Sequence, residues 1–96
     1  MIVSFGDGAT EDLYHGRPTS RALRFPREVA SAALVRMDML NGAAAVLDLR
    51  SSPGNRLEAP KGDLKELPSI RVNDQCRLVF RWQGNDAHQV RLMDYH

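Results

Sequence analysis

Apolar and polar residues alternate along residues 69–82, SIRVNDQCRLVFRW, and this alternation predicts a β-hairpin around Asn73-Asp74. Successive side chains of a strand point to opposite faces. The apolar positions of both runs therefore share one face only if directly opposed residue numbers sum to an even number. A three-residue turn meets this condition and a two-residue turn does not. The predicted apolar pairs are Val72 with Cys76 and Ile70 with Leu78.

The opposite face of this hairpin is rich in arginine. Its members are Ser69, Arg71, Arg77, Val79 and Arg81. Arg71 lies directly opposite Arg77, and like charges in that position repel and do not stabilise a sheet. Guanidinium groups do bind phosphate, through a planar pair of donors. We therefore expect a face that binds phosphate; the competing interpretation is a solvated charged face with no ligand.

The start of the chain predicts a short strand and a short helix. Residues 1–5 alternate, with Val3 and Phe5 pointing inward. Asp7 or Thr10 can cap the helix that follows, because both side chains accept a hydrogen bond from a first-turn amide. A glycine then ends this helix.

A longer helix is predicted after a polar connection over residues 16–25. Pro26 opens this helix and Asn41-Gly42 closes it. Apolar residues recur every three or four positions and define a buried stripe, with Val29 beside it: Ala30, Ala33, Leu34, Met37 and Leu40. Because many of them are alanines, the helix can lie close against a sheet.

Three segments connect this helix to the hairpin. Residues 43–50 indicate a short helical turn and residues 55–58 a strand. Residues 60–68 are expected to form a loop that holds Lys61 and Lys65.

The last strand is predicted over residues 87–93. Its core face is expected to pair with Leu78, Phe80 and Trp82, which places Arg91 opposite Val79 and Met93 opposite Arg77. By the same alternation, Tyr95 joins the arginine face. The predicted fold class is α+β, with N-terminal helices packed on one face of an antiparallel sheet and the other face free.

Composition indicates one small domain over residues 1–96. The net charge of +1 is a weak signal for nucleic acid, but arginine outnumbers lysine eleven to two. Arginine grips phosphate and stacks on bases, whereas lysine is a hydrated point charge. A GC-rich genome would also favour arginine, so composition alone leaves the question open.

The single cysteine, Cys76, excludes an internal disulfide and fits a reducing, cytoplasmic compartment. Its position on the apolar face predicts a buried packing thiol rather than a nucleophile. No apolar run approaches membrane-spanning length, and no signal-peptide pattern opens the sequence, so we expect no membrane association. Metal-ligand spacings, phosphate loops and nucleophile elbows are missing from the sequence, which predicts neither a metal nor a cofactor.

Several motifs together resemble a known family. They are SPGNRLE, KGD, SIRVNDQCRLVFRW, the opening MIVSF and the final DYH. The combination resembles the HigB toxins of the RelE/ParE toxin superfamily over nearly the whole chain. Residues 69–77 and Asp94-Tyr95-His96 are its most specific part.

The resemblance implies a fold and an activity. The family fold is a small antiparallel sheet with two N-terminal helices packed on it. Members are ribosome-dependent mRNA endonucleases that act in the 30S A site, without a metal or another cofactor. The 2′-OH attacks the adjacent phosphate and leaves a 2′,3′-cyclic phosphate. Each toxin is paired with a HigA antitoxin, a helix-turn-helix protein that inhibits it and through which alone it meets operator DNA.

Site residues follow from the same resemblance. Asp94, Tyr95 and His96 are assigned to an active-site tail, and Arg77 to charge stabilisation. The residues assigned to binding RNA phosphate are Lys61, Arg71 and Arg81.

Three positions depart from the family pattern. Glu58 stands where some members carry a histidine, so the second acid/base group is a carboxylate or is absent. Cys76 replaces a tryptophan that usually precedes the arginine, and Leu67-Pro68 replaces an aromatic residue before the SIR motif.

Two other functions remain open on sequence grounds. One is an inhibitory binder on the same fold, as in the ParE branch, which acts on DNA gyrase without cutting. The other is a degenerate toxin that binds only the ribosome or the antitoxin. The terminal DYH favours the enzyme, because a binder does not need titratable groups at the end of a sheet.

Overall fold

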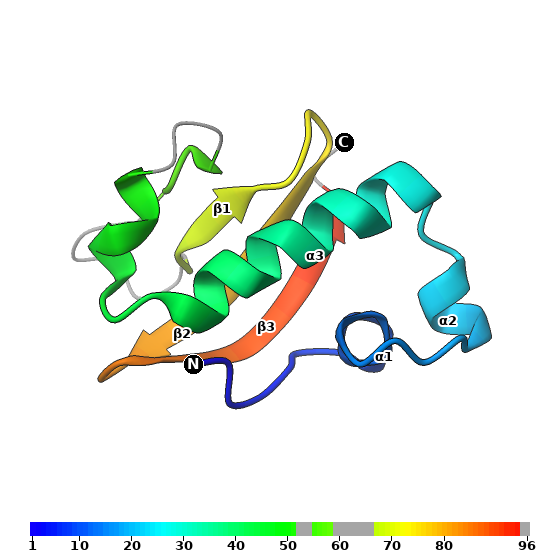
Figure 1. Cartoon of the computed structure of the whole chain (residues 1–96), viewed down its shortest axis with the longest axis horizontal. Helices are drawn as coiled ribbons and strands as arrows, with labels where there is room; N and C mark the ends of the chain where they lie inside the picture. Colours follow the sequence, from blue (N-terminus) through cyan, green and yellow to red (C-terminus); the bar gives the residue numbers. More distant parts are fainter. Residues whose placement is uncertain (52–54, 59–66, 95–96) are drawn as a thin grey trace.

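A computed structural model describes residues 1–51, 55–58 and 67–94. Three helices precede a sheet (Figure 1): α1 (Gly8–Tyr14), α2 (Ser20–Leu23) and α3 (Arg27–Gly42), followed by the 3₁₀ helix η1 (Val46–Ser51). The strands β1 (Ser69–Arg71), β2 (Cys76–Gln83) and β3 (Asp86–Asp94) form an antiparallel sheet in that order. The long helix α3 runs across one face of the sheet (Figure 1). The predicted α+β class is confirmed.

The register of the hairpin is the one that the apolar pattern predicts. Ile70 pairs with Leu78 and Arg71 with Arg77. The Val72 amide donates to the Cys76 carbonyl at 2.9 Å, which confirms the three-residue turn. The Asn73 side chain fixes this turn, because its Oδ1 accepts from the amides of residues 75 and 76 at 2.9 and 2.7 Å.

A β-bulge in β3 changes the predicted pairing beyond Val79. Arg91 does pair with Val79, as expected, but Arg81 pairs with His88 and Trp82 with Ala87. One extra residue of β3 therefore lies opposite β2, and Gln89 beside it has a left-handed φ of 53°. The expectation of unbroken alternation in β3 was wrong. The bulge reverses the alternation, so Ala87 is buried together with Val90 and Leu92.

The N-terminal segment follows this bulge along the free edge of β3. Isolated parallel bridges join Ile2 to Ala87 and Phe5 to Val90, with the same three-residue spacing on both sides. Val3, between them, is 45% exposed, so the expectation that it points inward was wrong. Phe5 packs against the core as predicted. Figure 1 shows this segment beside the start of β3.

The helices begin and end close to the predicted residues, with one addition. Asp7 caps α1 through a 2.8 Å hydrogen bond from the Thr10 amide, and α3 ends at Gly42. The helix α2 lies in what was predicted to be a polar connection, and Thr19 caps it. Its four residues are too short for a helical period to be visible in the sequence.

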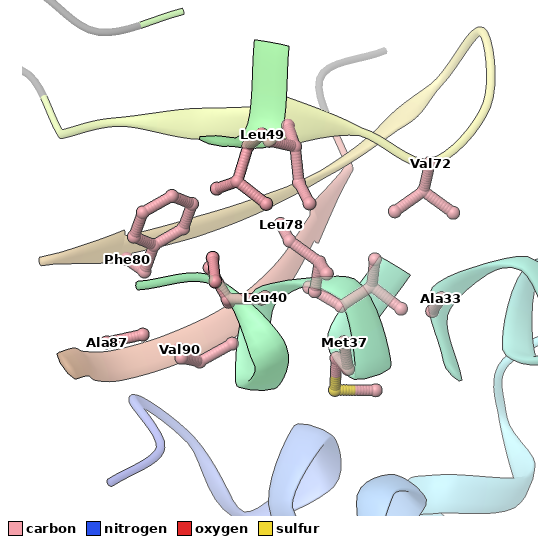
Figure 2. Close-up of a cluster of buried hydrophobic side chains, with 12 residues drawn as sticks. Ala33, Met37, Leu40, Leu49, Val72, Leu78, Phe80, Ala87 and Val90 are labelled. Atoms are coloured by element: carbon pink, nitrogen blue, oxygen red, sulfur yellow. The ribbon is translucent and has the colours of Figure 1, made fainter. Parts of the chain in front are cut away.

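The core lies between α3, η1 and the sheet. Ala33, Met37 and Leu40 form the fully buried part of the predicted stripe, whose other members are partly buried. Figure 2 shows them in one cluster with Leu49 of η1 and with Leu78, Phe80 and Val90 of the sheet. Burying each large side chain in this cluster contributes about 1.5–3 kcal/mol. The helical turn predicted over residues 43–50 is confirmed as η1. Within the described ranges no helix is long and apolar enough to cross a membrane.

Asp12 joins α1 to α2 through a buried ion-pair network. Its side chain is 2% exposed and accepts hydrogen bonds from Arg21, from Thr19 at 2.8 Å and from Arg17 at 3.2 Å. The hydrogen bond from Arg21, followed by that from Thr19, lowers the pKa of Asp12 from 3.8 to about 2, although burial acts in the opposite direction.

Candidate functional site

Arg77 is the central charged residue of the outer face, by which we mean the sheet face opposite α3. It lies on β2 between Cys76 and Leu78, which point toward the helices, so its own side chain points away from them. Only 15% of the side chain is exposed. Arg77 is therefore held within the protein surface rather than extended into solvent.

Four contacts hold the Arg77 guanidinium. Its Nε donates to Ser69 Oγ at 2.9 Å, and its Nη2 donates to the carbonyls of Arg56 at 2.6 Å and Ser69 at 3.2 Å. Its Nη1 lies 3.8 Å from Oε1 of Glu58. Because neutral carbonyl and hydroxyl groups make all three hydrogen bonds, they fix the direction of the side chain without cancelling its charge.

Arg56 presents its carbonyl to Arg77 from an unusual backbone conformation. Its φ of 42° lies in the left-handed region, which residues other than glycine seldom adopt. Next to it, buried Asn55 anchors the segment: its Oδ1 accepts from Arg36 of α3 at 2.6 Å and its Nδ2 donates to the Leu49 carbonyl at 3.0 Å. Contacts to α3 and η1 thus position one side of the Arg77 site.

Glu58 reaches the site as an isolated bridge partner of Ser69 rather than as part of a strand. The two residues exchange backbone hydrogen bonds of 2.9 and 2.8 Å. The strand predicted over residues 55–58 is therefore reduced to this one bridge. The Glu58 side chain is 70% exposed, so an incoming ligand can reach its carboxylate.

The other predicted arginines of the outer face have partners of their own. Arg71 forms an ion pair with Asp74, and Nε of Arg81 donates to Oε1 of Gln89 at 2.8 Å. At the centre of the face, Ser69 and Val79 are each only 4% exposed. The outer face is thus less open than a free sheet face, and its arginines are individually oriented.

Asp94 lies on the side of the sheet that faces the helices. It pairs with Cys76, and both line a cavity of about 380 Å³ together with Arg24 and Phe25. Directly paired strand residues share a face, so the structure does not bring Asp94 beside Arg77. Three other predicted site residues, Lys61, Tyr95 and His96, lie outside the described residues.

The thiol of Cys76 is partly buried, as a packing role requires. Burial and, to a smaller extent, the charge of Asp94 raise the pKa of Cys76 above 9.0. The thiol is therefore protonated at neutral pH and is a poor nucleophile. The prediction that Cys76 packs rather than reacts agrees with this environment.

The arrangement can bind a phosphate and can exchange a proton next to it. A fixed guanidinium matches phosphate oxygens, and a carboxylate beside it can accept a proton. Sequence reasoning placed Ser69 on the correct face but assigned it no role, and it missed Arg56 entirely. A backbone carbonyl leaves no trace in the residue type, so nothing in the sequence pointed to Arg56. Among the residues described here, histidine, cysteine and acidic side chains do not gather in groups of three that could hold a metal ion.

The chain is similar to known proteins over nearly its whole length. Residues 2–96 match the family described as RelE-like toxin of type II toxin–antitoxin system HigB. Toxin HigB-1 of Vibrio cholerae serotype O1 is 39% identical over 92 residues, which cover 96% of this chain and 95% of the relative. An uncharacterised protein of Haemophilus influenzae is 30% identical over 69 residues, covering 72% of this chain and 68% of the relative.

These matches agree with the helices packed on an antiparallel sheet, which is the arrangement expected of a RelE-like fold. They also imply a protein partner, because a type II system pairs a toxin with an antitoxin. The chain belongs to the HigB family of toxins of type II toxin–antitoxin systems.

Proposed function

We propose that the protein is a ribosome-dependent mRNA endonuclease of the cytoplasm, inhibited by a HigA-type antitoxin. The observation that carries this proposal is the fixed Arg77 guanidinium with the Glu58 carboxylate 3.8 Å away. Family membership supports the same conclusion. In this proposal residues 1–96 act as one domain that needs neither a metal nor another cofactor.

The reaction is an internal transfer at phosphorus. The 2′-oxygen attacks the adjacent phosphorus, the bond from phosphorus to the 5′-oxygen breaks, and a 2′,3′-cyclic phosphate and a 5′-OH remain. One proton leaves the 2′-OH and one is added to the 5′-oxygen. Negative charge grows on the phosphorane oxygens between these events, which a fixed cation stabilises.

Each role has a candidate. Arg77 stabilises the phosphorane, and Glu58 accepts the proton of the 2′-OH. His96 donates the proton to the leaving 5′-oxygen, because imidazole titrates near neutral pH. The neighbouring tail residues Asp94 and Tyr95 orient it. The residues proposed to bind flanking phosphates are Lys61, Arg71 and Arg81.

Dependence on the ribosome follows from charge and orientation. With a net charge of +1, the chain holds free RNA weakly, since phosphate neutralisation supplies most non-specific affinity. The ribosomal A site would present the message in a fixed geometry and so supply the orientation that the small protein lacks. Operator DNA would be bound only through the helix-turn-helix antitoxin.

The test is single-turnover cleavage of a defined message on programmed ribosomes, with cut sites mapped at nucleotide resolution. We expect His96→Ala and Tyr95→Phe each to slow cleavage by roughly 10²–10⁴-fold, the usual range for a positioned acid or base. Their combined effect should be smaller than the product, because the groups act together. Arg27→Ala, an exposed arginine of α3, is the matched control and should cut as the wild type does.

Three outcomes would contradict the proposal. Rapid cutting of naked RNA at physiological salt would remove the ribosome from the mechanism. Cleavage rates within about threefold of wild type in both tail variants would remove the tail from proton transfer. Growth arrest by the wild type without any cleavage would indicate an inhibitory binder instead.

A further inference from the structure

A cationic pocket lies on the outer face, away from Arg77. It has a volume of about 240 Å³ and is lined by Phe5, Gly6, Leu67, Arg81, Gln89 and Arg91. These residues come from the N-terminal segment, from the approach to β1, and from β2 and β3 around the bulge. We call this hollow the bulge pocket.

Arg81 is oriented in the bulge pocket but keeps its charge. Its Nε donates to Oε1 of Gln89 at 2.8 Å, and within the described residues no carboxylate pairs with it. The side-chain amide of Gln89 is neutral, so it fixes the guanidinium without neutralising it. With respect to the described residues, the two terminal nitrogens of Arg81 are left to donate to a ligand.

The bulge supplies this orientation. Gln89 has a φ of 53°, a left-handed conformation that residues other than glycine seldom adopt. Its amide donates to Ser4 Oγ at 2.9 Å, which holds the bulge against the N-terminal segment. Bulges commonly re-aim a side chain near a functional site, and here the re-aimed side chain is the one that holds Arg81.

Arg91 supplies the second charge. A Cβ added to Gly6 would lie only 3.0 Å from Cδ of Arg91, so the stem of Arg91 rests directly on the glycine backbone. Arg91 is exposed and forms no ion pair with the part of the chain that the structure describes. Two arginine side chains thus line the same pocket, and none of the lining residues that the structure describes is acidic.

We propose that the bulge pocket binds an RNA backbone phosphate other than the one that reacts at Arg77. Arg81 lies four residues along β2 from Arg77, roughly 13 Å at the rise of a strand, which is too far for one phosphate to contact both. Paired guanidinium forks match phosphate oxygens. This inference rests on the proposed ribonuclease function and deepens it; the phosphate belongs either to the message or to ribosomal RNA.

The first experiment needs no ribosome. Inorganic phosphate is titrated into the ¹⁵N-labelled protein at constant ionic strength, with chloride as the reference salt. We expect saturable NMR shifts of the Arg81 Nε–H and of the Gln89 and Arg91 amides, and their loss in Arg91→Ala. Shifts that merely follow ionic strength, or that survive in Arg91→Ala, would overturn the proposal whether or not the protein cuts RNA.

The second experiment identifies the source of the phosphate. Binding to vacant ribosomes and to ribosomes carrying a message is measured over a range of salt concentrations for Arg81→Ala, Arg91→Ala and the control Arg27→Ala. Each pocket variant should lower the slope of log affinity against log salt by roughly 0.7, the value for one single-stranded phosphate. A lower slope on both kinds of ribosome assigns the phosphate to ribosomal RNA. A lower slope only on ribosomes that carry a message assigns it to mRNA.

Two results separate this inference from the proposed function. If the protein shows the phosphate-dependent shifts but never cleaves RNA, phosphate binding by the bulge pocket is supported and the proposed ribonuclease function is contradicted. Pocket variants that keep the wild-type salt slope but lose antitoxin binding would make the bulge pocket a protein contact and overturn its assignment to phosphate.

Discussion

Oε1 of Glu58 lies 3.8 Å from Nη1 of Arg77, and the two side chains differ sharply in exposure, at 70% and 15%. The buried partner is also held by Ser69 and by the Arg56 carbonyl, whereas the other contacts of Glu58 with described residues are made by its backbone. Glu58 can therefore move toward a substrate while Arg77 stays in place.

Glu58→Gln tests whether this carboxylate accepts a proton. We expect cleavage on programmed ribosomes to slow by roughly 10²–10⁴-fold. The free energy of unfolding should change by less than about 1 kcal/mol, because the Glu58 carboxylate is exposed and lies 3.8 Å from its partner. Glu58→Asp is the matched control, since it keeps a carboxylate on a shorter stem. Equal cleavage rates in wild type and Glu58→Gln would mean that Glu58 transfers no proton and that only the tail residues remain as candidates.

Ser69→Ala tests whether the direction of Arg77 matters. The substitution removes the hydroxyl that accepts from Arg77 Nε and keeps the charge. A typical hydrogen bond contributes about 0.5–1.5 kcal/mol, so we expect cleavage to fall by up to about tenfold. Ser69→Thr retains a hydroxyl and should restore most of the rate. If it does not, the loss in Ser69→Ala reflects packing at this buried position.

Asp12→Asn should destabilise the protein at neutral pH and much less in acid. The pKa of Asp12 is lowered from 3.8 to about 2 in the folded protein, so its contribution is complete above the unfolded value and is lost as the pH falls toward 2. Denaturant melts at several pH values between 7 and 2 measure the difference from wild type. We expect this difference to narrow steadily below about pH 5.

Asp38→Asn is the control for this series. Asp38 is exposed on α3, so its replacement should change the free energy of unfolding little at any pH. A difference between wild type and Asp12→Asn that is independent of pH would mean that packing, not charge, carries the effect of Asp12.

Thr10→Val tests the junction between α1 and β3. Thr10 is fully buried, and its Oγ1 accepts from the Leu92 amide at 3.0 Å. Valine has nearly the same shape but cannot accept, which leaves a buried N–H without this partner. We expect a loss of about 1–3 kcal/mol in the free energy of unfolding. Thr10→Ser keeps the acceptor and should cost less; a larger loss in Thr10→Ser would assign the role of Thr10 to its methyl group.

The hairpin register could be predicted because all apolar side chains must lie on one buried face. Only registers in which opposed residue numbers sum to an even number meet this condition. That argument alone predicts Arg71 opposite Arg77, which is the pairing in the structure. It failed at Gln89, because nothing in the residue type signals that glutamine will adopt a left-handed conformation there. The candidate site likewise has one part that the residue pattern predicts and one part that it does not. The cation at Arg77 is visible in the pattern, whereas the carbonyl of Arg56 that orients it depends on a tertiary backbone path.

The hydrogen bond between Leu92 and Thr10 spans 82 positions of the chain, and the bridges from Ile2 and Phe5 to β3 span similar separations. During synthesis the N-terminal segment and α1 leave the ribosome long before β3 exists. Contacts between such distant segments form slowly, because the intervening chain must first be ordered. A nascent chain thus carries Arg77 on an incomplete sheet. The face that carries Arg77 therefore takes its final form only after β3 has joined both β2 and the N-terminal segment.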